Sequence, residues 1–240
     1  ISFAFFFNSF TFLVFAGALM AMKLELHDKK EKNGTSILTD MIDGVRYTYT
    51  HAGICAVLAS TIVCHLLIRP YIDLLPAFAD VVFNVGENGF ALLAGASGLG
   101  SLFGGIWLSV RGKNEGLTKI LCGGILGAAV LLIIFSATKY FVLGMICMVG
   151  VGFCLIIMAV ASQSLIQNSV DATKRARVIS LSTGIVVGFP AIGALVLGLF
   201  GDFWGVQGPT LIAGVMCLIY SISAVRRLLT QSSLLELNPK

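Results

Sequence analysis

The sequence contains seven apolar stretches, each about twenty residues long, separated by short polar segments. A bilayer core about 30 Å thick is crossed by about 20 apolar residues in helical conformation, so each stretch can span a membrane. The stretches are continuous rather than alternating, which favours helices over the strands of a β-barrel. We therefore expect an all-α integral membrane protein with seven transmembrane helices, near residues 3–22, 52–75, 89–110, 117–137, 141–166, 178–200 and 206–225.

The composition excludes the main classes of water-soluble protein. Only 12% of the 240 residues are charged and 57% are hydrophobic, whereas a soluble domain is about 25% charged. This excludes a soluble globular domain, a disordered chain and a secreted disulfide scaffold. The six cysteines all lie inside apolar stretches without a C-x-x-C pair, and there they act as small hydrophobic residues. We expect no disulfide, no metal site and no cofactor.

The first residue, Ile1, is followed directly by an apolar stretch. A signal peptide would begin with basic residues and end at a small-residue cleavage site, and neither is present. We therefore expect this chain to be part of a longer protein.

The longest polar segment, 23–51, separates the first apolar stretch from the other six. Its first half carries charges of both signs, which is typical of a solvated linker. In its second half Ile37, Met41, Val45 and Thr48 recur at helical spacing, which predicts an amphipathic helix at 36–50 lying along the membrane surface. In chain order we expect a transmembrane helix at 1–22, a cytoplasmic linker at 23–51, a six-helix transmembrane bundle at 52–226 and a cytoplasmic tail at 227–240.

The lysines and arginines of the loops predict the orientation of the chain. Of the 16 basic residues, fourteen lie on one side of the expected membrane spans, Lys139 alone lies on the other, and Arg69 lies within a span. Because short cytoplasmic loops are enriched in Lys and Arg, the linker and the C-terminus are expected to be cytoplasmic. The net charge of +4 is then explained by membrane topology, and no nucleic-acid partner is expected.

Glycines at G-x-x-x-G spacing occur in two of the expected spans. Gly100 and Gly104 form one such pair, and Gly184 and Gly188, followed by Pro190, form the other. Small residues at this spacing let two membrane helices approach closely. We expect these five residues to serve helix packing or a hinge.

The loop after the third apolar stretch resembles a known signature. It contains Gly105, Ser109, Arg111, Gly112 and Lys113, and it resembles the G-x-L-a-D-r-x-G-r-k motif of the major facilitator superfamily of transporters. Ser109 stands where that family usually has aspartate. The resemblance implies that this loop is a tight basic turn with a role in gating, and the missing aspartate puts the charge relay of the motif in doubt.

Three further segments carry the same resemblance. Residues 184–193 are similar to the g-x-x-x-G-P-x-x-G pattern of the family's exporters, with Phe189 before the proline. Residues 40–47 resemble the D-x-x-x-G-x-R-Y segment, and 174–180 resemble the R-G-R-V-x-S segment, of bacterial members related to the enterobactin exporter. This likeness implies two six-helix halves, so that the chain would supply span six, the linker and a major facilitator-type half bundle. The N-terminal six-helix half of the same polypeptide would be its partner, in the bacterial inner (plasma) membrane.

The second apolar stretch holds the candidate pathway residues His65, Arg69 and Asp73. Ionisable groups inside a span are costly and usually mark a pathway, and a spacing of four places them on one helix face. Arg69 and Asp73 can pair, His65 can titrate near neutral pH, and Pro70 and Pro76 would let the helix bend. The alternative is that Arg69 and Asp73 lie near the outer interface, where Arg69 reaches water and only His65 is buried.

Polar and aromatic residues elsewhere form a second candidate set. Ser162, Gln163, Ser164 and Gln167, near the end of the fifth stretch, could meet a substrate, and inter-helix hydrogen bonds explain them as well. Phe189 and Trp204 could contact an apolar substrate, or they could anchor the chain in lipid.

The function expected from these features is transport. The sequence contains no metalloprotease or serine-hydrolase motif, so we expect no enzyme. The resemblance implies a secondary active transporter that works by alternating access, with proton-coupled export of a small amphipathic molecule. Two alternatives stay open: a lysophospholipid flippase on the same fold, and a seven-span receptor or sensor if the chain is complete.

Overall fold

The computed structural model describes residues 2–21, 37–112, 115–232 and 236, and the described part of the chain contains helices without strands. It comprises two compact units, Ile1–Ile37 and Leu38–Lys240. The first unit contains helix α1 (Ser2–Ala21), which is apolar on all sides, as is typical of a helix that lies in lipid.

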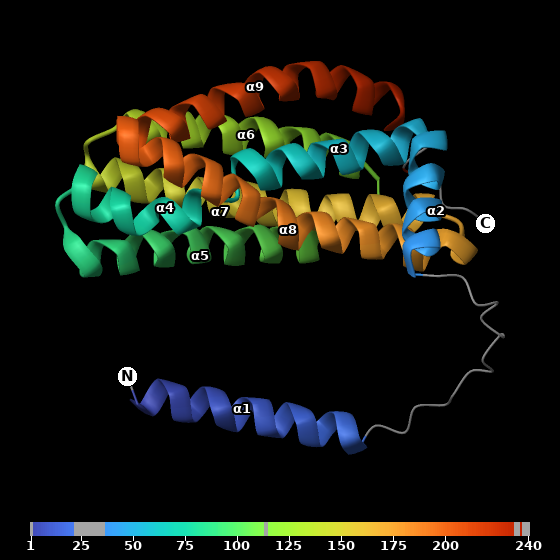
Figure 1. The fold of residues 1–240 in the computed structure, drawn as a ribbon, viewed down its shortest axis with the longest axis horizontal. Coiled ribbons are helices and arrows are strands. Elements are labelled where there is room, and N and C mark those ends of the chain that lie inside the picture. Colours follow the sequence, from blue (N-terminus) through green and yellow to red (C-terminus); the bar gives the residue numbers. More distant parts are fainter. Residues whose placement is uncertain (1, 22–36, 113–114, 233–235, 237–240) are drawn as a thin grey trace. The chain divides into compact units, whose positions relative to one another are not determined.

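The second unit has six helical segments long and apolar enough to span a membrane. Together with the shorter apolar stretch of α1, they confirm the expected all-α fold with seven helices. Figure 1 shows the six segments running side by side. In chain order they are Ala52–Val82, which combines α3, α4 and a π-helical turn, then α5 (Gly86–Arg111), α6 (Leu117–Ala137), α7 (Phe141–Ser169), α8 (Ala172–Trp204) and α9 (Gln207–Thr230).

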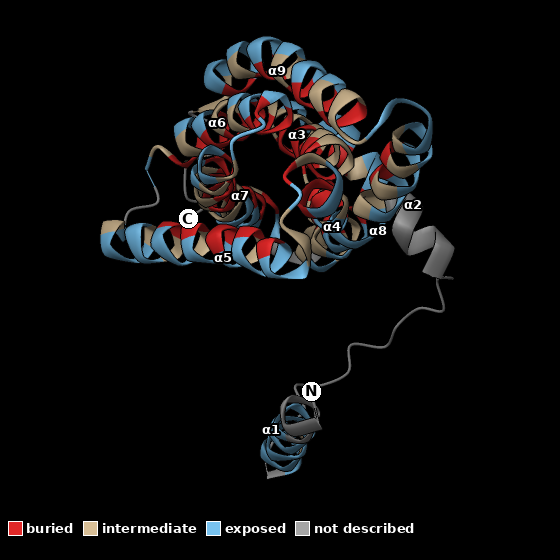
Figure 2. Ribbon diagram, turned by 90° about the vertical axis from the view of Figure 1, so that its left-hand side faces the viewer, coloured by how far each residue is buried: buried red, intermediate tan, exposed pale blue. Residues whose placement is uncertain are grey.

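Helix α7 holds the bundle together, because α5 and α6 both pack extensively against it. Helix α9 covers α6, and α3 packs against α8 and α9. In Figure 2, which looks along the bundle, the buried residues of α3 and α7 face the interior, and α5 has a long exposed side. The interface of α5 with α7 is very close: a Cβ added at Gly100 would lie 1.8 Å from the carbonyl oxygen of Val149.

The second expected span is broken in the structure. Helix α3 (Ala52–Leu67) ends before Pro70, and α4 (Tyr71–Ala77) and the π-helical turn (Phe78–Val82) continue to Val82. Proline lacks a backbone N–H and disturbs the helical ladder, and the Arg69 N–H bonds the Cys64 carbonyl, five residues back. The break also changes the register of Arg69 and Asp73. Among the described side chains no ion pair joins these two, so the expected internal pair is not formed.

Helix α2 (Ile37–Thr50) lies crosswise at one end of the bundle (Figure 1), where the sequence predicts an amphipathic surface helix. Helix α8 is longer than the stretch 178–200, because the basic segment 172–177 extends it at the start and residues 201–204 extend it at the end. It begins after Asp171 and ends at Gly205, whose positive φ of 72° favours glycine.

Candidate functional site

His65 and Arg69 lie at the middle of the helical segment Ala52–Val82. His65 is 13 residues after its first residue, and Arg69 is 13 residues before its last. Arg69 is thus farther from the end of this segment than from residue 75, where the stretch 52–75 ends. Asp73 lies one turn beyond the break and is exposed.

A cavity of about 340 Å³ opens beside these two residues, between the broken helix, α5 and α7. Its polar lining comprises His65, Arg69, Tyr71, Ser97 and Ser101. The rest of its wall is mostly aliphatic and comes from all three helical segments. A concave site with a mostly apolar wall and a few converging polar groups is the usual form of a small-molecule site.

The hydrogen bonds of His65 determine which ring nitrogen can exchange a proton. The Nδ1 atom lies 2.8 Å from the carbonyl oxygen of Thr61. A carbonyl oxygen can only accept, so Nδ1 carries the hydrogen in the neutral ring and Nε2 keeps its lone pair. The hydroxyl of Thr61 donates to the Val57 carbonyl and contacts Ser162 Oγ at 2.9 Å. His65 is thus held in place by α3 itself, and α3 is held to α7.

Three cavity residues were missed by the sequence interpretation. The Tyr71 hydroxyl and Ser97 Oγ form a hydrogen bond across the cavity wall. Ser101 Oγ donates to the carbonyls of Ser97 and Gly152, each at 3.1 Å. Ser97 and Ser101 lie one turn apart within the small-residue face of α5, and this spacing is a signal for a polar stripe. The glycines of the same face predict helix packing alone, so the two serines do not stand out in the sequence.

The other candidate residues lie away from this cavity. Gln163 and Gln167 are exposed near the end of α7, and Ser162 is buried in its contact with Thr61. Phe189 is half-buried and packs against the core. The structure therefore joins His65 with Arg69, but it does not add Asp73 or the two glutamines to the same site.

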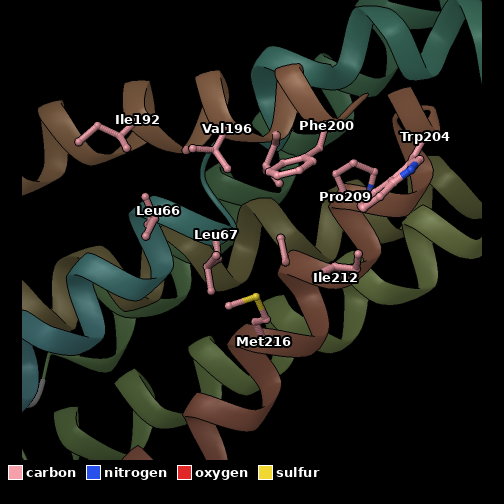
Figure 3. A pocket seen from close by; sticks show the side chains of 12 residues that line it. Leu66, Leu67, Ile192, Val196, Phe200, Trp204, Pro209, Ile212 and Met216 are labelled. Carbon is pink, nitrogen blue, oxygen red and sulfur yellow. The ribbon is translucent and has the colours of Figure 1, made fainter. Parts of the chain in front are cut away.

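Trp204 lines a second hollow, an apolar groove of about 500 Å³ between α3, α8 and α9. Figure 3 shows Ile192 and Val196 of α8 across from Leu66 and Leu67 of α3, with Met216 of α9 next to Leu67 and with Phe200 and Trp204 toward the other end. The two aromatic rings stack with centroids 5.7 Å apart. None of the described residues that line the groove is charged.

The basic loop between α5 and α6 is described on both sides of residues 113–114. Gly112 ends α5 with a φ of 56°, and Gly116 precedes α6 with a φ of 75°, both in the left-handed region that favours glycine. The Arg111 guanidinium folds back and donates to the Glu115 carbonyl. Ser109 is exposed, Gly105 has open space around it, and Lys113 lies outside the described residues.

A carboxylate from the C-terminal segment caps this turn. Glu236 accepts hydrogen bonds from the backbone N–H groups of Gly116, at 2.7 Å, and Thr118, at 3.0 Å. These are unsatisfied donors at the start of α6, which favour a negative charge. Partial burial opposes ionisation of Glu236, but the interactions with Gly116 and Thr118 and the nearby charge of Lys119 together outweigh it and lower the pKa of the carboxyl below its ordinary value. The sequence spacing of 120 residues between Gly116 and Glu236 gave no local signal for this contact.

Replacing Glu236 with glutamine is expected to loosen the turn. Loss of a partly exposed charge-assisted bond should speed amide exchange at residues 116 and 118 about fivefold near pH 7. Because the folded-state pKa of Glu236 is lowered, its stabilising effect is present above the ordinary glutamate range and is lost as pH falls through the lowered pKa. Hydrogen exchange of the whole protein between pH 7 and pH 4 measures both effects.

Glu115→Gln is the matched control for that experiment, since Glu115 is exposed in the same turn and uses only its carbonyl there. It should leave the exchange of residues 116 and 118 unchanged. Equal protection in the Glu236→Gln and wild-type proteins would show that the tail does not hold the turn.

Two segments that carry the family resemblance, 40–47 and 174–180, lie in contact at one end of the bundle. The Tyr47 hydroxyl of α2 lies 3.2 Å from the Asp171 carboxylate, just before α8. A Cβ added at Gly44 would contact Arg177 at 3.5 Å. The 40–47 segment is therefore docked on the start of α8, which contains 174–180.

The two G-x-x-x-G pairs differ in their surroundings. Gly100 and Gly104 face α7, and a Cβ at Gly104 would lie 2.4 Å from Ile156 Cγ2. Gly184 and Gly188 are exposed on α8 and have no described heavy atom within 4 Å of an added Cβ. Pro190 lies within α8 two residues later and is half-buried.

Comparisons with known proteins give one family model and one curated relative. The family model described as transmembrane secretion effector matches residues 1–240. The chain is 28% identical over 150 residues to YfmI of Bacillus subtilis (strain 168), an uncharacterized MFS-type transporter. That match covers 61% of this chain and 36% of the relative, so the chain spans well under two thirds of the length of the curated relative. No solved structure matches the chain significantly.

Proposed function

This chain belongs to the transmembrane secretion effector family of major facilitator superfamily transporters, and on that premise we propose that it supplies half of a proton-coupled exporter. It is a multi-pass membrane protein of a secondary transporter family. The proposed cargo is a small amphipathic molecule, moved by alternating access between this half bundle and an N-terminal half of the same polypeptide. Membership of a transporter family favours this function over the seven-span receptor.

The observation that carries the proposal is the His65–Arg69 cavity. Secondary transporters bind substrate and coupling ions near the bilayer midplane, at an interrupted helix between two repeats. Here the two ionisable residues flank the midpoint of the segment Ala52–Val82, and the helix is interrupted next to them. Histidine changes its charge between about pH 5 and 8, and its free Nε2 is suited to carry the proton. We propose His65 and Arg69 as pathway residues in the cavity. Asp73, Gln163 and Gln167 would belong to the same pathway at positions outside the cavity.

The exposed faces of α5 and α8 support a partner half. Only 17% of the apolar window of α8 and 28% of that of α5 is buried, against 50% for α6. Gly184 and Gly188 lie on this exposed part of α8 with open space around them. A helix face that contacts lipid does not require small residues, whereas a face that packs closely against another helix does. We propose that this face meets the N-terminal half, with Pro190 acting as a hinge.

The topology we propose places the C-terminus and the basic loops in the cytoplasm, with the protein in the bacterial inner membrane. Fourteen of sixteen basic residues on one side support this orientation. In this orientation the α5–α6 turn and α2 lie on the cytoplasmic side, where gating contacts with the partner half would form.

The experiment that tests export uses the whole protein in inside-out membrane vesicles. Accumulation of two amphipathic fluorescent probes, 1-anilinonaphthalene-8-sulfonate and N-phenyl-1-naphthylamine, is followed while a proton gradient, acidic inside, is imposed. We expect accumulation that a protonophore abolishes and that vesicles without the protein lack. Accumulation of neither probe above those control vesicles would contradict export of such amphipaths.

A second candidate function is lysophospholipid flipping, and the apolar groove of Figure 3 is the observation that favours it. The groove lies between membrane-spanning helices, has no charged lining residue, and has a volume of about 500 Å³. A lysophospholipid would occupy it with its acyl chain. Replacing Leu67 with tryptophan would fill the groove, so it should impair lysophospholipid flipping in vesicles but leave probe export intact. Impaired probe export would instead indicate that the groove is part of the export pathway.

A further inference from the structure

Among the described residues, the lining of the cavity beside α3 carries one permanent positive charge and no negative one. Arg69 is the only lysine or arginine in its lining, and no aspartate or glutamate among the described residues lines it. The other titratable side chains facing Arg69 are His65, on its own segment, and Tyr71. α5 contributes Ser97 and Ser101, and α7 contributes apolar side chains only.

Arg69 has no counter-ion among the residues that the structure describes. Its guanidinium makes neither an ion pair nor a hydrogen bond with any described residue, although it is half-buried. The nearest acids in the sequence, Asp73, Asp80 and Glu87, are all exposed, and Asp80 and Glu87 line a different hollow at the end of the bundle. A partly buried charge without a partner is costly, so an anion that enters this cavity relieves that cost.

The other polar groups of the cavity are already engaged. The Ser101 hydroxyl donates to backbone carbonyls, and the hydroxyls of Tyr71 and Ser97 bond each other. The Tyr71–Ser97 pair leaves one hydroxyl hydrogen free. The charged donors that make no hydrogen bond with a described residue are the guanidinium N–H groups of Arg69, whose planar fork matches the two oxygens of a carboxylate, sulfonate or phosphate. Ile72 and Met158 belong to the aliphatic wall and offer a surface to an apolar body.

We propose that the molecule carried by this transporter is an amphipathic anion, whose acidic group binds Arg69 and whose apolar part lies along α7. This inference rests on the proposed export function and specifies its substrate class. A cationic or neutral amphipath leaves Arg69 uncompensated and binds less tightly.

The two fluorescent probes form a matched pair for testing this inference, because they share an anilinonaphthalene skeleton and differ in the sulfonate. Binding is measured by fluorescence titration of the whole protein in nanodiscs, with empty nanodiscs subtracted. The wild type should bind the sulfonate about tenfold more tightly than the neutral probe. Arg69→Gln should remove that preference, and Arg69→Lys should restore part of it, since it keeps the charge without the fork.

Controls separate charge recognition from folding. Arg226→Gln removes an exposed arginine at the end of α9 and should leave both affinities unchanged. Unchanged binding of the neutral probe shows that Arg69→Gln is folded. Displacement of the bound sulfonate by lysophosphatidylglycerol rather than decanoate would identify a lipid as the anion, and the reverse would identify a soluble amphipath; both support an anion site.

The possible failures are distinguishable. If the wild type binds both probes equally, or if Arg69→Gln keeps the full preference for the sulfonate, the anion inference is wrong. In that case proton-driven accumulation of the probes would still support export. If the sulfonate preference depends on Arg69 but no gradient drives either probe, the anion site stands and the export function fails.

Discussion

Replacing His65 with glutamine is expected to lower proton-driven accumulation of substrate at least about tenfold, while exchange of substrate down its own gradient continues. Glutamine is close to histidine in size and can still donate to the Thr61 carbonyl, which lies 2.8 Å from Nδ1. It cannot take up a proton at the position of Nε2. The measurement compares accumulation under an imposed pH gradient with counterflow at equal pH, in vesicles that contain the whole protein.

His51→Gln is the matched control, because His51 lies at the start of α3 outside the cavity and its ring packs on Tyr47. It should leave driven accumulation near the wild-type level. Full driven accumulation in His65→Gln would rule out His65 as the proton carrier. Asp73→Asn should have little effect on its own, since Asp73 is exposed and lies outside the cavity lining.

Substitution of Gly100 with alanine is expected to produce the largest loss of stability. The added Cβ would lie 1.8 Å from the Val149 carbonyl oxygen, which belongs to the backbone of α7 and cannot rotate away. The helices must separate, and overpacking of this kind costs about 3 kcal/mol or more. The apparent Tm of the purified protein should fall by on the order of 10 °C.

A graded series tests this explanation. Gly104→Ala should destabilise the protein less than Gly100→Ala, because its closest neighbour is a side-chain atom, Ile156 Cγ2, and the nearest backbone atom of α7, the Phe153 carbonyl oxygen, lies at 3.0 Å. Gly123→Ala should be neutral or slightly stabilising, since no atom lies within 4 Å and alanine is the better helix former. Equal Tm values for Gly100→Ala and Gly123→Ala would show that α5 and α7 are not held by close backbone contact.

The helical architecture was predictable because membrane spans depend on a local property. A continuous apolar stretch such as 117–137 must form its hydrogen bonds within one helix when it lies in lipid. The observed bounds of α6, Leu117–Ala137, coincide with that stretch. The polar residues 172–177 extend α8 at its start, so hydropathy alone underestimated its length.

The site was only partly predictable, because it depends on register and on distant contacts. His65 and Arg69 could be found from their charge in an apolar stretch. The break at Pro70 takes Asp73 out of their register, and an i, i+4 spacing cannot show such a break. The contribution of Ser97 depends on how α5 meets α7, which a pattern along one helix does not contain.

The central claim is that the His65–Arg69 cavity is the aqueous pathway of the transporter. Cysteine labelling in a cysteine-free version of the whole protein tests it most directly. Ala159 lines the cavity, whereas Ile219 is an exposed residue of α9. We expect a membrane-impermeant thiol reagent to label Ala159→Cys and not Ile219→Cys, which faces lipid. An unlabelled Ala159→Cys, whichever side of the membrane the reagent reaches, would contradict the account.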